Sequence, residues 1–537
     1  MIRRVTPVLL FLTVAVFSQT PSSAPQFDGR SWWGYVKVLA ADDMEGRETG
    51  SEGLRRASAY VVDQLKKNGL EPAGSDGFYQ PVKLQSRQIV EDQSSLALVR
   101  NGKTQPLVLG DDAMFSTRAA LAPHLEAPLV FAGYGLRVPE MHYDDLAGLD
   151  LKGKVAVLLV GSPEQMPSAL ASHYQSLGER WKAFQQAGAI GIVTIQNPAA
   201  MDIPWERQRL ARTRPSMSLV DPALDDAAGE QLAITFNPAR AQKLFEGTGH
   251  TFDEIAALGK ERKPLPRFPL NLSIDAYATL RTQELDSANI LARLPGSDPA
   301  LRNEYVVLSA HLDHLGVGAP IRGDRIYNGA MDNASGSAVL LDTAASLRRS
   351  PEKLKRSVLF LFLTAEEKGL LGSKYFAARP TVSPGSIIAN INIDMFLPIF
   401  PLRVLTVYGL AESDLGDLVT EVARSQGLRV QPDPEPLRNA FIRSDQYNFI
   451  RHGIPAIAMK VGFEKNSPEE KAAHDWLTER YHAPSDDLDQ PVDLAAAGKY
   501  EDVIRALLVT VSNTDRPPQW KQNSFFRRFA GTDRAGD

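Results

Sequence analysis

The sequence predicts an α/β fold with a mostly parallel central sheet flanked by helices, and a separate smaller unit with short strands. From about residue 270, short and nearly continuous apolar runs alternate with helical segments, which is typical of strands covered on both faces. Between roughly residues 116 and 269 the pattern changes to a different series of short strand-like runs. A chain of 537 residues is also too long for one ordinary core, so two or more domains are expected.

The N-terminus has the layout of a secretory signal. Arg3 and Arg4 precede an apolar stretch from Val8 to Phe17, and small or polar residues follow. A membrane anchor needs around 20 apolar residues, and this stretch is shorter. We therefore expect a signal peptide over residues 1–18, cleaved near Ser18, a secreted or periplasmic mature chain, and no stable membrane insertion.

The next segment predicts two helices around a Gly-rich centre. Ser31 to Leu70 shows helical spacing at both ends, and the second helix runs from about Ser51 to Asn68. It stops at Gly69, a residue that suits a helix C-terminus.

Residues 116–269 predict a separate small unit. The strand-like runs PLVFAGYGL and KVAVLLVG precede a helical KAFQQAGA, and the strand-like IGIVTI follows it. Residues 270–515 then predict βα alternation. The expected strands are YVVLSA, SVLFLFLT, IIANINID, VLTVYG and PAIAMKV, and the helices between them include ASGSAVLLDTAASLRR and one from Gly372. The tail over 516–537 is charged and contains proline, so we expect it to be irregular.

Composition excludes several classes of function. The formal charge of −5 is small for the length and shows no basic face, so we expect neither nucleic acid nor an anionic membrane as a partner. The absence of cysteine excludes disulfides, thiol catalysis and thiolate metal sites. Any bound metal must therefore use His, Asp and Glu.

Acids and histidines follow several of the predicted strands, where ligands bind in open α/β sheets. His311 and Asp313 follow YVVLSA, Glu366 and Glu367 follow SVLFLFLT, Asp394 ends IIANINID, Asp332 lies in the turn NGAMDNASG, and His482 lies in the loop RYHAPSDD. Taken singly, each is an ordinary surface, turn or helix-capping residue. Together at one end of a sheet they would be costly to bury without cations, and the nitrogen and oxygen donors suit zinc, or less often manganese or cobalt.

The other seven histidines are expected at surface or structural positions. They are His124, His142, His173, His250, His314, His452 and His474. Of these, His314 lies beside the candidate site in the sequence.

These motifs resemble a known family. HLDHLG, NGAMDNASGSA, FLTAEEKGLLGS, NIDM and YHAPSDD occur in the order and approximate spacing of the M28 metallopeptidases, the co-catalytic zinc aminopeptidases and their carboxypeptidase relatives. The likeness extends to DDMEGRETGSEG near the N-terminus, and FAGYGL through AGAIGIVTI resembles a protease-associated (PA) domain. The resemblance implies a zinc peptidase-like, phosphorylase/hydrolase-type fold. It also implies an N-terminal part of the catalytic domain over 19–115, an inserted PA domain over 116–269, and the main catalytic part over 270–515.

The resemblance also implies roles for the strand-end residues. His311 and Asp394 would bind one of two zinc ions per chain, Glu367 and His482 the other, with Asp332 between them. Glu366 would be the general base, since successive side chains of an extended segment point to opposite sides, one to metal and one to water. Asp313 would accept the second ring N–H of His311, and Tyr481 would hydrogen-bond the tetrahedral oxyanion.

The function implied is that of a secreted di-zinc exopeptidase acting on peptides through a metal-activated water, foremost an aminopeptidase. An M28-type carboxypeptidase or dipeptidase is the first alternative, followed by a glutaminyl-cyclase-like acyltransferase and a non-catalytic receptor-like module. The complete ligand set and the insert favour hydrolysis. In FIRSDQYNF, Gln446 stands where the family often has histidine, and Arg443 or Ser444 could contact a substrate terminus. Residue preference, the role of the insert and the oligomeric state stay open.

Overall fold

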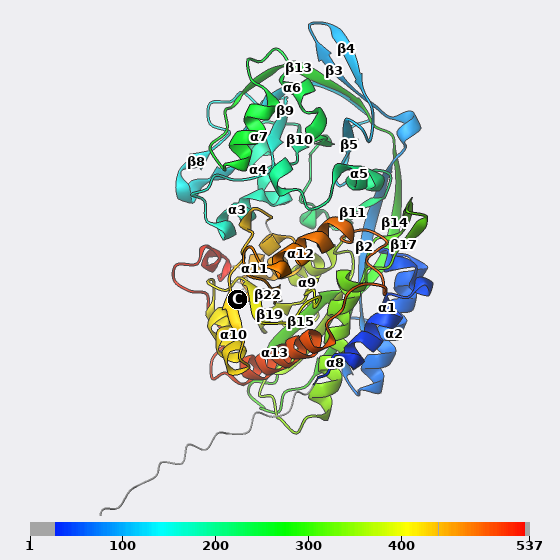
Figure 1. Cartoon of the computed structure of the whole chain (residues 1–537), viewed down its shortest axis with the longest axis vertical. Coiled ribbons are helices and arrows are strands. Elements are labelled where there is room, and N and C mark those ends of the chain that lie inside the picture. The colour runs from blue at the N-terminus through cyan, green and yellow to red at the C-terminus, as the bar shows by residue number, and fades with distance from the viewer. Residues whose placement is uncertain (1–26, 439, 532–537) are drawn as a thin grey trace, which may run out of the picture.

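The computed structural model describes residues 27–438 and 440–531, which form two lobes (Figure 1). The lower lobe is built on a ten-stranded sheet and the upper lobe on an eight-stranded sheet. The predicted signal peptide over 1–18 lies outside the described residues.

The lower sheet is parallel at its centre and antiparallel over most of the rest. Its strands, in spatial order, are β11 (Ser216–Leu219), β2 (Tyr79–Ile89), β14 (Leu280–Leu294), β18 (Ser357–Leu363), β15 (Tyr305–His311), β19 (Ile387–Asn392), β22 (Ala456–Gly462), β20 (Val404–Tyr408) and β21 (Arg429–Gln431), with β1 (Glu71–Pro72) beside β14. Neighbours from β18 to β22 are parallel, as are β20 and β21, whereas β11, β2, β14 and β18 pair antiparallel.

The prediction of a mostly parallel sheet is therefore wrong for the sheet as a whole and correct for its centre. Parallel neighbours need crossover connections, which the βα alternation after β14 provides. Between β2 and β14 the chain instead builds the upper lobe, so these strands return antiparallel to each other.

Helices cover both faces of the lower sheet. They are α1 (Arg30–Leu39), α2 (Glu52–Lys67), α8 (Ser335–Arg349), α9 (Leu371–Ala378), α10 (Asp414–Ser425), α11 (Gln446–Arg451), α12 (Pro468–Glu479) and α13 (Leu494–Asn513). Alternate residues of β15 enter two cores, because successive strand residues face opposite sides. Val306 and Leu308 pack with α1, α2, α8 and α13, whereas Val307 packs with α9 and α11.

The expected elements of the lower lobe are present close to their predicted bounds. β15, β18, β19, β20 and β22 match the five apolar runs, and α8 matches the predicted helix between the first two. The second predicted helix near the N-terminus is α2, whose cap residue Ser51 accepts a hydrogen bond from the Leu54 N–H at 3.1 Å.

The upper lobe extends beyond residues 116–269 on both sides. Its strands, in spatial order, are β4 (Lys103–Leu107), β3 (Ser95–Arg100), β13 (Phe268–Tyr277), β6 (His124–Phe131), β9 (Val155–Leu159), β10 (Gly191–Ile195), β12 (Leu232–Phe236) and β5 (Ala113–Phe115). Its helices are α3 (Ser168–Gln175), α4 (Leu177–Gln186), α5 (Trp205–Gln208), α6 (Gln242–Phe245) and α7 (Phe252–Lys260). The difference arises because β13 pairs with β3, which precedes the predicted boundary, while β11 lies within 116–269 and joins the lower sheet.

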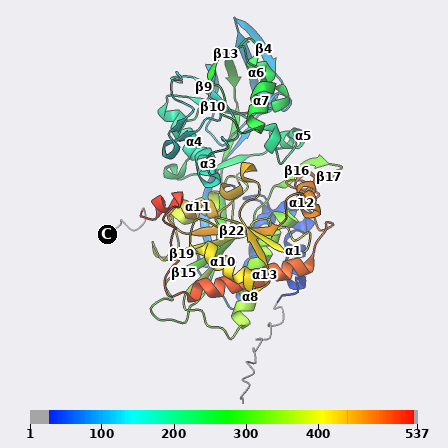
Figure 2. The same ribbon diagram turned by 60° about the vertical axis from the view of Figure 1, so that its left-hand side comes forward.

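Short strand pairs and the C-terminal segment complete the description. The short pairs are β7 (Arg137–Val138) with β8 (Tyr143–Asp144), and β16 (Gly316–Ile321) with β17 (Asp324–Tyr327). The tail, expected to be irregular, contains a 3-10 helix over Phe525–Phe529, and Phe526 is buried against the lower lobe. This 3-10 helix lies beside α11 (Figure 2).

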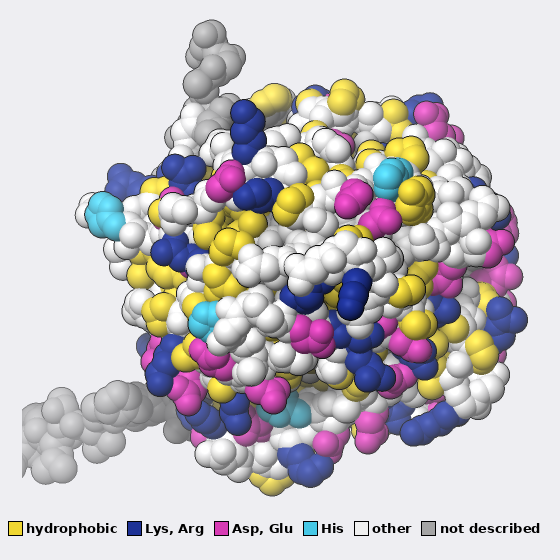
Figure 3. Space-filling model, turned by 90° about the horizontal axis from the view of Figure 1, so that it is seen from above, with side chains coloured by type: hydrophobic (Ala, Val, Ile, Leu, Met, Phe, Trp, Pro, Cys, Tyr) yellow, Lys and Arg dark blue, Asp and Glu magenta, His cyan; other side chains and the backbone are white. Residues whose placement is uncertain are grey.

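The upper surface carries mixed charge. Seen from above, Lys and Arg side chains alternate with Asp and Glu, without a large area of one sign (Figure 3). Within the described ranges, every helix is too short or too polar to cross a bilayer.

Candidate metal centre

The ends of three neighbouring strands position the candidate site. β15 ends at His311, Glu366 follows β18, and Asp394 follows β19. These strands are parallel, so their carboxyl ends meet at one edge of the sheet. The turn before α8 and the loop after α12 add Asp332 and His482 at the same edge.

One group of ligand atoms surrounds His311. Its Nε2 lies 3.3 Å from Oδ1 of Asp332 and 3.5 Å from Oδ1 of Asp394. The His311 and Asp332 side chains are buried, and that of Asp394 is 15% exposed. The spacing of these three donors fits a single metal ion.

A second group surrounds Glu367. Nε2 of His482 lies 3.2 Å from Oε2 of Glu367 and 3.3 Å from Oδ2 of Asp332. Asp332 therefore presents one carboxylate oxygen to each group, as a residue shared by two ions would. All five ligands expected from the sequence converge here.

His314 also joins the second group. It is fully buried, and its Nδ1 lies 2.7 Å from Oε1 of Glu367 and 3.8 Å from Oδ2 of Asp332. With Glu367 and Asp332 it forms a further set of donors spaced for one ion. From the sequence alone, we expect His314 among the surface or structural histidines. The only sequence signal for a place in the site is that His314 is the second histidine of HLDH.

The titration behaviour of the cluster reflects a surplus of carboxylates. Burial lowers the pKa of His311, but Glu366, Asp332 and Asp394 raise it more, so its pKa lies well above the ordinary value. Burial opposes the same effect at His482, where Glu367 and Asp332 raise the pKa to about 9. Burial raises the pKa of Asp332, yet His311 and His482 hold it well below its usual range. The cluster therefore attracts positive charge.

The donor atoms fit zinc. Within the described ranges, Nε2 of His311 and Nε2 of His314 are buried without a hydrogen-bond partner. Leaving such atoms unsatisfied is costly, and a cation would complete them. Imidazole nitrogen and carboxylate oxygen are zinc ligands, and the chain has no thiolate to offer.

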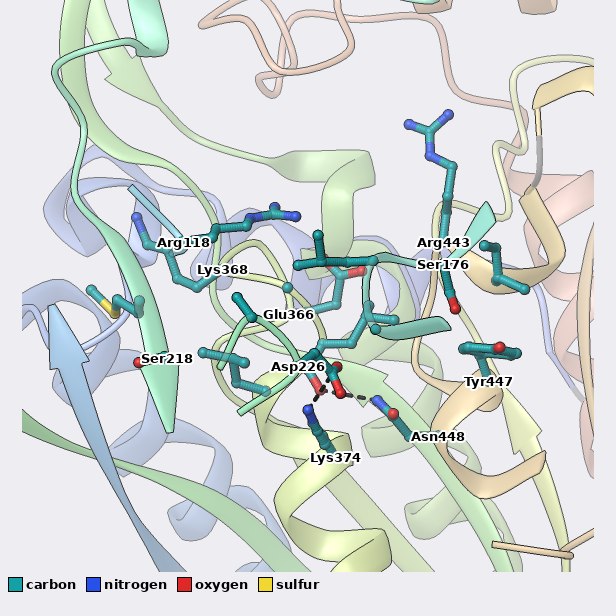
Figure 4. A pocket seen from close by; sticks show the side chains of 18 of the residues that line it. Arg118, Ser176, Ser218, Asp226, Glu366, Lys368, Lys374, Arg443, Tyr447 and Asn448 are labelled. Carbon is teal, nitrogen blue, oxygen red and sulfur yellow. Dashed lines mark hydrogen bonds and ion pairs between the residues drawn. The ribbon is translucent and has the colours of Figure 1, made fainter. Parts of the chain in front are cut away.

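Glu366 faces the solvent cavity beside the two groups. Its side chain is 10% exposed, and its Oε2 lies 4.0 Å from Nε2 of His311. It lines a cavity of about 380 Å³ between the lobes (Figure 4). Burial raises the pKa of Glu366 well above its ordinary value, although His311 opposes this. The residue before it, Ala365, has a left-handed φ of 55°, a costly conformation that turns the chain at the strand end.

Asp313 supports the site differently from the expectation. Nδ1 of His311 lies 3.1 Å from the main-chain carbonyl oxygen of Asp313, whereas the Asp313 carboxylate is 4.0 Å away. That carboxylate instead accepts hydrogen bonds from the Glu366 N–H at 3.0 Å and the Thr49 hydroxyl at 2.9 Å. Asp313 thus orients His311 through its backbone and Glu366 through its side chain.

Two buried charged residues that the sequence did not single out hold the loops of the site. The Arg47 guanidinium donates to the carbonyls of Leu312 at 2.8 Å, Asn328 at 2.7 Å and Gly329 at 2.9 Å. Asp486 accepts from the N–H groups of Met331 at 2.9 Å and Asp332 at 3.0 Å. Both lie inside quoted motifs, but their partners are distant in sequence.

Tyr481 connects the metal centre to the upper lobe. Its ring lies 4.0 Å from that of His482, and its hydroxyl accepts a hydrogen bond from Nη2 of Arg443 at 3.3 Å. Nη1 of Arg443 in turn pairs with Asp202 of the upper lobe at 2.5 Å. Burial raises the pKa of Tyr481, so its hydroxyl keeps its proton.

Gln446 is fully buried and serves the structure of this loop. Its Oε1 accepts from Nδ2 of Asn392 at 3.0 Å, and its Nε2 donates to the carbonyl of Phe441 at 2.9 Å. Ser444 accepts from the same Asn392 amide at 2.8 Å. The amide of Gln446 is therefore used within the fold.

Comparisons with known proteins relate this chain to peptidases. Residues 289–508 match the model of peptidase family M28. The chain is 31% identical over 232 residues to a probable leucine aminopeptidase 2 of Aspergillus fumigatus, covering 41% of this chain and 42% of that protein. It is 28% identical over 255 residues to aminopeptidase Y of Saccharomyces cerevisiae, covering 46% and 43%. The matches thus span less than half the length of these curated relatives.

A solved structure resembles the whole fold. The aminopeptidase from Aneurinibacillus sp. strain AM-1 superimposes with a TM-score of 0.55 at 19% identity. The match covers 90% of this chain and 93% of that one, so both lobes take part in the likeness of fold.

Proposed function

Because residues 289–508 belong to peptidase family M28, we propose that this chain is a zinc aminopeptidase that releases N-terminal residues from peptides. One observation carries the proposal. Two groups of nitrogen and oxygen donors, one around His311 and one around His482, share Asp332 at the edge of the sheet, beside a mostly buried glutamate that faces a cavity. The names of the related proteins support aminopeptidase activity in particular.

Five residues would hold two zinc ions. His311 and Asp394 would bind one ion, Glu367 and His482 the other, and Asp332 would contribute to both. When bound, zinc supplies Lewis-acid polarisation of the scissile carbonyl and lowers the pKa of water.

The remaining steps fall to side chains of this chain. Glu366 takes the proton of the attacking water and delivers it to the leaving amine, a role that its raised pKa suits. Asp313 fixes the backbone of Glu366 through the hydrogen bond to its N–H. Tyr481, protonated and held by Arg443, donates to the oxyanion of the tetrahedral intermediate.

Matched peptides with free and acetylated N-termini test the proposal. The zinc-loaded protein should hydrolyse the free peptides and leave the N-acetylated ones intact. Turnover of the acetylated peptides from their C-terminal end would instead favour the carboxypeptidase alternative. Absence of hydrolysis from both sets would contradict peptidase activity altogether.

The upper lobe and the N-terminus complete the proposal. The motifs from FAGYGL to AGAIGIVTI support a PA-domain identity for the central part of the upper lobe. The paired arginines and apolar stretch at the N-terminus support export. N-terminal sequencing of protein from its native source should give a start near Gln19, and an intact Met1 would contradict export.

A further inference from the structure

A second cavity of about 470 Å³ continues from the one that contains Glu366. Both lie between the lobes, and both are lined by Arg118, Gln175, Leu177, Ile442 and Arg443. The second cavity contains none of the metal-site residues and reaches toward α4 and β10 of the upper lobe. We call it the arginine chamber. A peptide whose N-terminus lies at the metal centre could extend its other end into this space.

Two arginines of the chamber have no carboxylate partner among the residues that the structure describes. Nε and Nη2 of Arg180 are buried, and no described residue hydrogen-bonds to them. The nearest influence on this guanidinium is Asp145, which accepts from Tyr143 and Leu136 and lies beyond ion-pair distance of it. Arg118 likewise has no carboxylate within 4.0 Å in the described part of the chain, and it extends beside Glu366 (Figure 4).

The acids of the chamber do not neutralise these arginines. Asp202 is already engaged, because it lies 2.8 Å from Nε of Arg438 and 2.5 Å from Nη1 of Arg443. Burial raises the pKa of Glu230 to about 8, so this acid is mostly uncharged at neutral pH. The chamber therefore carries a surplus of positive charge in a partly desolvated space, where a buried unpaired cation is costly.

We propose that the arginine chamber binds a carboxylate on the C-terminal side of the scissile bond, through Arg180 and Arg118. Guanidinium groups bind carboxylates through paired, charge-assisted hydrogen bonds, so the orphaned Nε and Nη2 of Arg180 are suitably arranged donors. The carboxylate is either the C-terminus of a short peptide or an acidic side chain of a longer one. The proposal deepens the proposed function and rests on it, since it places the downstream part of the peptide in the chamber.

The first experiment compares peptides of two to six residues as free acids and as C-terminal amides. The zinc-loaded wild type should show a roughly ten- to hundred-fold higher kcat/KM for the free acid at the length that reaches the chamber. A second arm uses amidated peptides with Glu or Gln at each downstream position. A preference there identifies an acidic side chain as the source of the carboxylate. Equal rates in both arms would overturn the proposal.

Variants then assign the preference to the chamber. In Arg180→Met and Arg118→Met the free-acid to amide ratio, or the Glu to Gln ratio, should fall toward one. Arg240→Met is the matched control, because Arg240 is an exposed arginine of the upper lobe that lines neither cavity. Retention of the full ratio in both chamber variants would contradict the proposal.

A binding measurement separates this inference from the proposed function. The full-length Glu366→Gln protein, loaded with zinc, is titrated with a free-acid peptide and its amide by calorimetry. Tighter binding of the free acid supports the chamber even if the wild type proves not to hydrolyse peptides. Equal affinities for the free acid and the amide at every length would contradict carboxylate binding in the chamber and would leave the peptidase proposal unaffected.

Discussion

The metal centre and the arginine chamber carry uncompensated charge of opposite sign on either side of one interlobe space. At the metal centre, carboxylates outnumber their partners and raise the pKa of His482 to about 9. In the chamber, Nε and Nη2 of Arg180 have no acceptor among the described residues, and burial raises the pKa of Glu230 to about 8. Buried groups are normally satisfied, so each surplus indicates a ligand of the opposite charge. Under the two proposals made above, the first region binds cations and the second binds the anionic end of a substrate.

Removal of zinc from the metal centre should have the largest effect on activity. Dialysis against a chelator should abolish hydrolysis and lower the thermal midpoint while circular dichroism still reports a folded chain, because ligands that bind only the native state stabilise it. Metal analysis should return about two zinc ions per chain before treatment. Full activity with at most one tightly held ion would refute the two-ion site.

The substitution Glu366→Gln should have the second-largest effect, a loss of turnover. The amide keeps the shape of the side chain but cannot accept the proton, so turnover should fall on the order of 10²–10⁴-fold with zinc content nearly unchanged. Glu367→Gln is the matched control, because it removes a charged ligand and its activity should recover partly with added zinc. Peptidase activity of both variants within a few-fold of the wild type would show that neither glutamate acts in catalysis or metal binding.

The substitution His314→Gln tests whether His314 contributes to metal binding in addition to the five expected ligands. Its contact with Glu367 at 2.7 Å predicts a roughly 10–100-fold loss of affinity for one zinc ion, as for other residues that orient metal ligands. Competition with a chromophoric chelator measures that affinity. His474→Gln is the control, since His474 is an exposed partner of Glu435. Identical affinities in the two variants would return His314 to a structural role.

Glu230→Gln should have the smallest effect, and it concerns the chamber. The pKa of Glu230 rises from an ordinary 4.5 to about 8 on folding, so between those values the folded state binds more protons than the unfolded state. Stability should therefore fall as pH rises across this window, by an amount on the order of a few kcal/mol. The variant should lose that part of the decline in thermal midpoint between pH 5 and 8. Parallel curves for both proteins would show that Glu230 ionises normally.

The sequence identified the parts of the site that depend on local pattern. Strand ends could be read from apolar runs, and the βα alternation implied that those ends meet, which brought together His311, Glu366 and Asp394. The shared role of Asp332 required the family resemblance. The order of the outer strands could not be read, because β2 and β14 pair across the whole upper lobe.

The missed residues act through partners distant in sequence. His314 joins the cluster only because folding buries it against Glu367, and the hydrogen bonds of Asp486 to the turn at Asp332 span 154–155 positions. The arginine chamber joins Arg118 and Arg180 to Arg443 of the other lobe. The distribution of charged residues along the sequence does not predict that these three arginines line one cavity.

The hydrogen bonds of Arg47 also determine how late in synthesis the N-terminal segment can reach its native contacts. Its carbonyl partners at Leu312 and Gly329 lie 265 and 282 residues further along the chain, and Trp32 donates to Ser335 after 303 residues. At roughly 5–20 residues per second, a ribosome takes on the order of ten seconds to a minute to supply them. Until then the apolar faces of α1 and α2 lack β15 and α8, against which they pack in the folded protein. These hydrogen bonds can therefore form only after α8 has been synthesised, and the metal centre only after the loop that carries His482.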